Sequence, residues 1–458
     1  MMRRKIINDP VFGFIGIPNE FVYEVIQHPF LQRLNRIKQL GLASFVYPGA
    51  QHTRFHHSIG AMFLMDEALK TLKEKGQPIA ESEYNGALAA ILMHDTGHGP
   101  FSHVLEHTLV THINHETISL LLMQQMNNEW KGELQAAIDI FTDNYPKRFL
   151  HQLVSGQLDV DRLDYLRRDS FFTGVSEGNI GSARIIKMLE VKDDKLVVES
   201  KGIYSIENFL MSRRLMYWQV YLHKTALAAE KMMINTLHRA RELSLNGEKL
   251  FASPALSFFL RNETTMADFT GNGEAMRHFI SLDDNDIWTS LKVWSTHDDK
   301  VLSVLSDAMV NRKLFKIEIT EQRTSEEKYT ALLDGYRKKY RLSPHEAAYF
   351  LSSDIVTTDM YSEKDDSIDI LYKDGTVKDI SKASDMLNIE LLSKKVVKYY
   401  FALGTKNHTT TAPIIPRARI TILMDIFWMT TNEEKSTMVV IKAITPIFPL
   451  RVTPFRLW

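Results

Sequence analysis

The amino-acid sequence predicts a mainly α-helical protein with small β-hairpins, followed by a second module that mixes helices and strands. Apolar residues recur three and four positions apart through most of the first 245 residues, as in helices that bury one face. Short strand-like segments flank a turn at Asp193 and Asp194, and two more flank residues 373–376. After Gly247 the chain becomes more acidic, which indicates a separate module.

Residues 1–245 are expected to form a helical domain with a minor β insertion. The apolar periodicity is clearest at residues 21–40, 58–72, 85–93 and 115–126. Helix-breaking residues predict loops between these stretches, at Pro29, Pro48, Gly76, Gly97 and Pro100. A hairpin is expected at residues 191–200, after which helices resume at Ile206.

Residues 246–405 are predicted to form an α+β module with an oligomerisation or regulatory role. Residues 314–320 have the composition of a strand, and residues 368–372 and 377–380 flank a Lys-Asp-Gly-Thr turn. The final segment, 406–458, is rich in proline and threonine and carries a net positive charge. Its sequence assigns it no fold.

Composition excludes several classes of protein. The 458 residues carry 55 Lys and Arg against 56 Asp and Glu, and this net charge of −1 argues against a protein that coats nucleic acid or an anionic membrane. The absence of cysteine excludes disulfides, zinc fingers and thiol nucleophiles, so any metal must sit on histidines and carboxylates. Neither a signal peptide nor a membrane-spanning stretch is recognisable, so we expect a soluble, cytoplasmic protein.

Histidine is concentrated in one part of the chain. Nine of the 17 histidines lie between positions 52 and 115, which is typical of a metal or acid–base site. His94 and Asp95 end an apolar run at residues 87–93 and precede a glycine-rich break, so a buried helix would deliver both side chains to one opening. Neighbouring nitrogen and oxygen ligands suit a divalent metal. By contrast, His297 and Asp298 lie in a polar stretch and are interpreted as surface residues.

Two ligands do not hold a catalytic metal, so others must come from elsewhere in the chain. His57, at the start of a predicted amphipathic helix, is the third candidate, and Asp161 is the fourth. Asp161, Tyr165 and Asp169 share one helix face, so they can point into one cleft. Taken alone, such a face is more typical of a solvated charged stripe.

Seven segments follow one another in an order that is typical of a known enzyme family. They are NDP at 8–10, LQRL at 31–34, IKQLG at 37–41, YPGA at 47–50, RFHHSIG at 54–60, HDTGHGPFSH at 94–103 and DVDRLDY at 159–165. These segments resemble the HD-domain deoxynucleoside triphosphate triphosphohydrolases, over residues 3–240. The resemblance is closest to the branch that contains the animal sterile-alpha-motif and HD-domain enzyme and its bacterial relatives, and it implies an HD-domain helical core.

The resemblance implies a role for individual residues. It makes the metal ligands His57, His94, Asp95 and Asp161. The catalytic residues would be His98, His115, Glu106 and His103, and Glu106 would orient His115. The substrate-binding residues would be Gln39, Arg54, Arg162, Tyr165, Asp169, Arg213, Tyr217 and Tyr221. Among these, the arginines would contact phosphates, Gln39 and Asp169 would hold the sugar 3′-hydroxyl, and Tyr165 would pack on the deoxyribose.

The family's reaction converts a deoxynucleoside triphosphate (dNTP) into a deoxynucleoside and intact triphosphate. The resemblance implies Mn, Fe, Zn or Ni at the metal site, Mg on the substrate phosphates, and a homo-oligomer, either dimer or tetramer. A nucleotide activator is compatible with Lys5 and Asn8, which match nucleotide-site positions. However, Gln27 and Asn35 stand where the animal enzyme has an acidic and a basic residue that recognise guanine, and Phe12 stands where the family usually has histidine.

Two alternatives stay open on the sequence. Another HD phosphohydrolase, acting on nucleoside monophosphates, cyclic nucleotides or alarmone, would share the scaffold. A non-catalytic protein that binds nucleotides or single-stranded nucleic acid would use the basic tail and the surface. The presence of His98, His115 and Glu106 argues against the second alternative, because a protein that only binds has no need of them.

Overall fold

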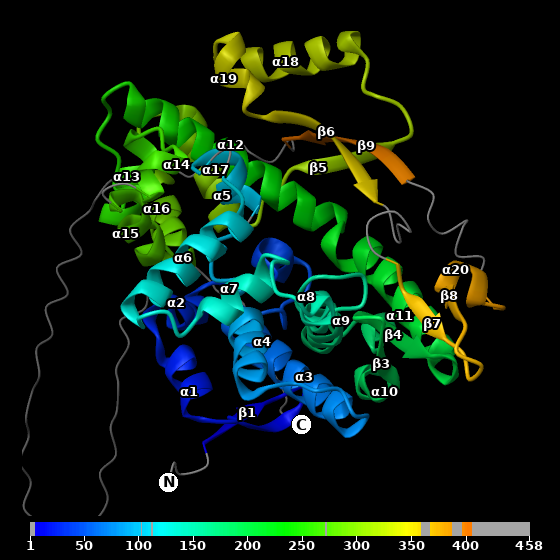
Figure 1. The fold of residues 1–458 in the computed structure, drawn as a ribbon. Helices are drawn as coiled ribbons and strands as arrows, with labels where there is room; N and C mark the ends of the chain where they lie inside the picture. Colours follow the sequence, from blue (N-terminus) through cyan, green and yellow to red (C-terminus); the bar gives the residue numbers. More distant parts are fainter. Residues whose placement is uncertain are drawn as a thin grey trace, which may run out of the picture. The chain divides into compact units, whose positions relative to one another are not determined.

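The computed structural model describes residues 5–101, 103–110, 113–270, 273–358, 367–386 and 396–404. The chain divides into two units, residues 1–410 and 411–458, and all described residues belong to the first. The predicted tail at 406–458 therefore lies outside the described residues. Helices dominate the described part and are accompanied by small sheets (Figure 1). The predicted mainly α class is confirmed.

Twelve α-helices lie among the described residues of the first 245 and surround the site. They are α1 (Glu20–Gln27), α2 (Pro29–Gln32), α3 (Arg54–Glu74), α4 (Glu81–Met93), α5 (His103–Thr108), α6 (His115–Glu129), α7 (Gln135–Phe141), α8 (Arg148–Val154), α9 (Val160–Thr173), α10 (Ser182–Met188), α11 (Ile203–Met216) and α12 (Lys224–Leu245). Three of the four predicted helical stretches appear within α3, α4 and α6.

The prediction of helical periodicity through residues 21–40 is wrong in its second half. His28 has extended backbone angles, because a residue before proline is disfavoured in the helical region, and α1 ends there. The chain continues through α2 and a 3₁₀ turn at Arg33–Arg36. It then forms an irregular segment, and this segment carries Gln39 into the site.

The second half of the described chain mixes helices and strands, as predicted. Its helices are α13 (Pro254–Arg261), α14 (Met266–Thr270), α15 (Glu274–Ser281), α16 (Asp284–Trp294), α17 (Lys300–Val310), α18 (Glu326–Tyr340), α19 (Pro344–Ala348) and α20 (Ile380–Ala383). The strands of the whole described chain are β1 (Ile6–Asp9), β2 (Gly13–Gly16), β3 (Leu189–Lys192), β4 (Lys195–Glu199), β5 (Lys316–Thr320), β6 (Leu351–Thr358), β7 (Asp369–Leu371), β8 (Val377–Asp379) and β9 (Val396–Leu403).

The strands form three small sheets among the described residues. Strands β1 and β2 pair as an antiparallel hairpin, and the other sheets have the orders β3-β4-β7-β8 and β5-β9-β6. The hairpin predicted at residues 191–200 is confirmed, and Asp193 and Asp194 both adopt the positive φ that a two-residue hairpin turn requires. Strand β7 pairs with β4 in parallel, so backbone hydrogen bonds cross the predicted boundary at residue 245. That boundary stays a prediction.

The central helix of the buried core is α4. Every residue from 86 to 93 is buried, because α4 packs against α3 on one side and α7 on another. Gly86 is needed for this packing, since a Cβ atom there would press on Ala136. The burial of α4 fixes the position of His94 at its end. No helix in the described ranges is both long and apolar enough to cross a bilayer.

Candidate active site

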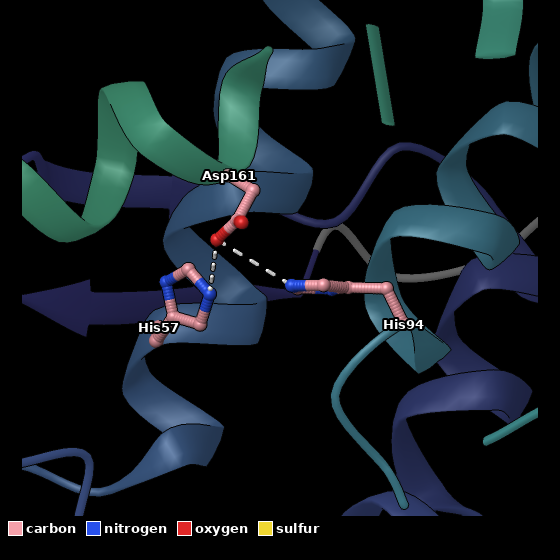
Figure 2. A group of neighbouring side chains, drawn as sticks. All are labelled: His57, His94 and Asp161. Atoms are coloured by element: carbon pink, nitrogen blue, oxygen red, sulfur yellow. Dashed lines mark ion pairs between the residues drawn. The ribbon is translucent and has the colours of Figure 1, made fainter. Parts of the chain in front are cut away.

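Three side chains from three helices meet at the core (Figure 2). His57 lies in the first turn of α3, His94 caps the end of α4, and Asp161 lies in the first turn of α9. One ligand atom from each of the three lies within 4.8 Å of the others. The Nε2 atoms of His57 and His94 lie 3.0 and 3.5 Å from Asp161 Oδ1.

Asp95, the fourth predicted ligand, lies beside this group. Its Oδ1 is 3.3 Å from His94 Nε2, and its Oδ2 is 3.8 Å from His57 Nε2. Arg54 donates a hydrogen bond of 2.6 Å to the same Oδ2. Burial opposes the charge on Asp95, but the nearby His94 and Arg54 hold the pKa of this carboxyl well below its usual range. The carboxylate is therefore ionised and able to bind a cation.

The two histidines present the atoms that a metal needs. His57 Nδ1 donates to Asp164 Oδ2 at 2.7 Å, and His94 Nδ1 donates to the carbonyl oxygen of Ile91 at 2.6 Å. Each ring therefore turns its Nε2 inward, and both Nε2 atoms are buried without a hydrogen bond among the described residues. This pairing of ring nitrogens with outer partners is typical of metal-bound histidines. Two imidazoles and two carboxylates fit a divalent transition metal.

Asp164 is a functional candidate that the sequence analysis did not single out. It is fully buried, and besides His57 it binds Arg168 through both carboxylate oxygens at 2.9 Å. Arg168 in turn binds Asp9 Oδ2 at 2.7 Å, so a chain of charges runs from the ligand group to the end of β1. Gly60 faces this chain on α3, where a Cβ atom would overlap Asp164 and Arg168. The three- and four-residue spacing of Asp161, Asp164 and Arg168 on one helix is the feature of the sequence that could have indicated a role for Asp164.

A second group of titratable side chains adjoins the first. His98, Glu106 and His115 each place one ligand atom within 4.8 Å of the others. The rings of His98 and His115 stack with their centroids 3.8 Å apart, and His115 Nδ1 lies 2.8 Å from Glu106 Oε1. His98 Nε2 lies 3.4 Å from Asp95 Oδ1, which joins the two groups. The side chain of His103 lies outside the described residues.

One cavity of about 650 Å³ opens onto both groups. Eleven of the residues that the sequence analysis selected line it: Gln39, Arg54, Asp95, His98, His115, Asp161, Arg162, Tyr165, Asp169, Tyr217 and Tyr221. The rest of the wall is mostly apolar, and sequence patterns did not predict it: Leu40, Gly41, Leu42, Ala43, Phe101, Val220, Leu222, Ala226, Leu227 and Glu230. The cavity is thus charged near the ligand group and has apolar wall segments elsewhere.

The segment that carries Arg213, Tyr217 and Tyr221, which are spaced four residues apart, is not a regular α-helix. Helix α11 ends at Met216, and a π-helical turn follows at Tyr217–Tyr221. Both tyrosines line the cavity, whereas Arg213 is not among its lining residues and donates to Gln157 Oε1 at 2.9 Å. The wider π turn changes the angle between successive side chains, so a four-residue spacing no longer places all three on one line.

Asp169 and Gln39 differ in the hydrogen bonds that they already make. Asp169 is buried, and its two oxygens contact His52 Nε2 at 2.8 Å and accept from the Tyr221 hydroxyl at 2.7 Å. Gln39 Oε1 is buried and has no hydrogen-bond partner among the described residues. Of the two side chains, Gln39 therefore has the acceptor that a ligand hydroxyl can reach without displacing a protein contact.

Comparisons with known proteins show which families this chain resembles. A family model described as the HD domain matches residues 54–169, and one described as the HD associated region matches residues 180–267. The chain is 30% identical to the protein YwfO of Bacillus subtilis over 411 residues, which cover 86% of this chain and 90% of that one. It is 27% identical to the deoxynucleoside triphosphate triphosphohydrolase SAMHD1 of Homo sapiens over 280 residues, 52% of this chain and 44% of that enzyme.

A solved structure is also similar. The crystal structure of a phosphohydrolase from Bacteroides thetaiotaomicron superimposes with a TM-score of 0.86 at 62% identity, covering 88% of this chain and all of that one. The range that matches the HD domain contains His57, His94 and Asp161. This protein therefore belongs to the HD-domain family of phosphohydrolases that includes the deoxynucleoside triphosphate triphosphohydrolases.

Proposed function

We propose that this protein hydrolyses dNTPs to a deoxynucleoside and triphosphate with the help of a divalent metal. The observation that carries the proposal is the composition of one cavity. It is lined by the metal-ligand candidates Asp95 and Asp161, by the stacked pair His98 and His115, and by Gln39, whose Oε1 has no hydrogen-bond partner among the described residues. The cavity thus combines groups that can bind a cation, transfer a proton and accept a hydrogen bond from a sugar hydroxyl, and its volume suits a small-molecule ligand.

In the proposed reaction, the arginines and the histidines have different roles at the phosphate chain. Arg54 and Arg162 line the cavity, where their charges would stabilise the negative charge that builds up on the α-phosphate. A divalent cation held by His57, His94, Asp95 and Asp161 would act as a Lewis acid and activate water as the nucleophile. Water adds to the α-phosphorus, and the bond from phosphorus to the 5′-oxygen breaks. His115, which contacts Glu106, would give the departing 5′-oxygen its proton.

The sugar would lie against Tyr165 and Gln39. Tyr165 lines the cavity and meets the Tyr221 ring edge-on at 6.1 Å. Its ring would leave no room for a 2′-hydroxyl, while Gln39 Oε1 would accept a hydrogen bond from the 3′-hydroxyl. Asp169 would support the same site by holding Tyr221 in place. The homo-oligomer and the cytoplasmic location remain part of the proposal.

The identity of the released phosphate tests the reaction. With each dNTP, the wild-type protein is expected to release triphosphate and no orthophosphate, because in the proposed binding mode the arginines and the ligand group would lie around the α-phosphorus. Chromatography of reactions with terminally labelled dNTP identifies the product. Diphosphate or orthophosphate as the first product, or hydrolysis of nucleoside monophosphates, cyclic nucleotides or alarmone in place of dNTPs, would assign the protein to another HD activity.

Sugar discrimination is expected to depend on Tyr165. Replacing Tyr165 by Ala should lower the dATP to ATP ratio of kcat/KM by about 10-fold or more, since a lost steric contact is worth about 1–3 kcal/mol. Tyr204, which is exposed and outside the cavity, supplies a matched tyrosine-to-alanine control. Steady-state kinetics on both nucleotides measures the ratio, and thermal melting shows whether the fold survives. Equal hydrolysis of ATP and dATP by the wild type would refute the assignment.

A further inference from the structure

Arg33 makes an unusual set of contacts beside the site. It belongs to the 3₁₀ turn Arg33–Arg36 and is 1% exposed. Its guanidinium donates to five backbone carbonyl oxygens: at 2.8 Å to Thr96 and His98, at 3.3 Å to Ile280 and Phe279, and at 3.4 Å to Leu282. It also lies 4.9 Å from the centre of the Phe279 ring.

Buried arginines usually pair with a carboxylate. These five hydrogen bonds of Arg33 all go to carbonyl groups, and the nearby Asp283 carboxylate is bound by Arg36 Nε at 2.7 Å instead. Burial, with repulsion from Arg36, lowers the pKa of Arg33 to about 9, so it stays charged at neutral pH. Because a guanidinium is a rigid plane with five N–H donors, such an arrangement fixes the relative positions of its acceptors.

The carbonyls belong to two segments that are far apart in sequence. Thr96 and His98 lie in the loop that follows His94 and Asp95, and the other three acceptors lie at the end of α15 and just after it. The loop is held from its other side by Ser119, whose Oγ accepts from the Gly97 amide and donates to the His94 carbonyl. The loop therefore sits between Ser119 and Arg33.

The loop has little freedom to adjust by itself. A Cβ atom on Gly97 would overlap the backbone oxygen of His115, so the backbone at Gly97 touches the segment that carries His115. A shift of the Thr96 and His98 carbonyls would thus change the stacking of His98 on His115 and the direction of the two ligands before it. The turn after α15 also reaches the other wall of the cavity, because Asp284 Oδ2 accepts from the Lys38 amide, next to Gln39.

We propose that Arg33 is a positioning residue, which fixes the loop that carries His94, Asp95 and His98 against the turn between α15 and α16. Arg33 does not line the cavity, so it acts through the loop. The inference rests on the proposed function, because the positioned groups are the proposed metal ligands and the histidine pair. It adds that residues 279–284, in the module after residue 245, help to determine the geometry of the active site.

The test compares Arg33→Lys and Arg33→Met with Arg36→Ala. Lysine keeps the charge but cannot span both groups of carbonyls, and methionine keeps the length without a donor. Arg36→Ala removes the neighbouring ion pair between Arg36 and Asp283. The side chain of Arg36 is about half exposed. Three readouts are needed: the affinity and visible spectrum of bound Co²⁺, kcat and KM for dATP, and the melting temperature.

A displacement of about 1 Å can lower a rate about 100-fold. We therefore expect Arg33→Lys to lose about 10- to 100-fold in kcat, with KM changed by less than about threefold. Its melting temperature should stay near that of the wild type. Its Co²⁺ spectrum should shift, whereas Arg36→Ala should match the wild type in spectrum and kcat. If Arg33→Met does not fold, Arg33→Lys decides the question.

Wild-type Co²⁺ binding and kcat in a folded Arg33→Lys variant would overturn the inference. An equal loss of kcat in Arg36→Ala would also overturn it, since the effect would then come from any contact that attaches the turn between α15 and α16, and not from Arg33 itself. The Co²⁺ comparison needs no substrate. A wild-type protein that binds Co²⁺ but hydrolyses no dNTP would therefore refute the proposed function, while the spectra of the variants would still decide the role of Arg33.

Discussion

Replacing His94 by Ala is expected to remove the bound metal and to lower dNTP hydrolysis by about 1000-fold or more, on the order of the cost of losing a main electrostatic contribution to catalysis. His94 supplies one of two imidazoles, and its Nε2 is buried with no hydrogen bond in the described structure. The cavity left by alanine cannot replace this ligand. Elemental analysis of purified protein gives the metal content, and product release from dATP gives the rate.

The chain provides a matched control for this variant. His297 and Asp298 form the other His-Asp pair, and His297 Nδ1 accepts a hydrogen bond from the Asp299 amide at 3.0 Å. His297→Ala should leave metal content and rate unchanged. Because a ligand that binds only the folded state raises stability, added metal should raise the melting temperature of wild type and His297→Ala but not of His94→Ala. Full metal content and turnover in His94→Ala would show that the site lies elsewhere.

The second large effect is expected at Asp164. Asp164→Ala should lower the free energy of unfolding by about 3–5 kcal/mol, because it leaves the buried Arg168 with Asp9 as its remaining carboxylate partner. It should also weaken metal binding by about 10- to 100-fold, since His57 loses the partner that orients its ring. Urea denaturation of the metal-free protein and a metal titration measure the two effects separately.

The control for this prediction is an ion pair on α3 in which the lysine is exposed. Lys70 binds Asp66 four residues earlier at 2.7 Å, and its side chain is 54% exposed. Lys70→Ala should cost less than about 1 kcal/mol and leave metal affinity unchanged. Asp164→Asn keeps the shape of the side chain, so it serves if the alanine variant does not fold. If Asp164→Ala has the stability and metal affinity of Lys70→Ala, the chain of charges behind His57 has no role.

Several candidate residues of this site could be selected from the sequence, because the ability to bind a metal depends on residue type. His57, His94 and Asp161 were selected by their types and by motifs, and the structure places them together. The predicted hairpin at Asp193 and Asp194 also appears, since a two-residue turn is specified by neighbouring residues. Local rules were sufficient wherever the contacts are local or the family motif names the residue.

The same rules did not reach contacts that depend on how distant segments pack. In the sequence, Asp164 is one of several acidic residues on a polar helix. Only the packing of α9 against α3 buries it beside His57. The π-helical turn Tyr217–Tyr221 was also not predicted, and Arg213, in the regular helix before it, does not line the cavity with the two tyrosines. Backbone irregularity of this kind is set by packing rather than by spacing.

By itself, the sequence determined the fold class and the family and supplied the candidate ligands, because these follow from residue types, apolar periodicity and short motifs. Only the tertiary structure decided which charges are buried and which polar atoms remain without partners. Arg33 and the Thr96 carbonyl are separated by 63 residues, and Arg33 and the Ile280 carbonyl by 247. No local pattern specifies such contacts, since the burial that gives them their energy exists only after the chain has folded.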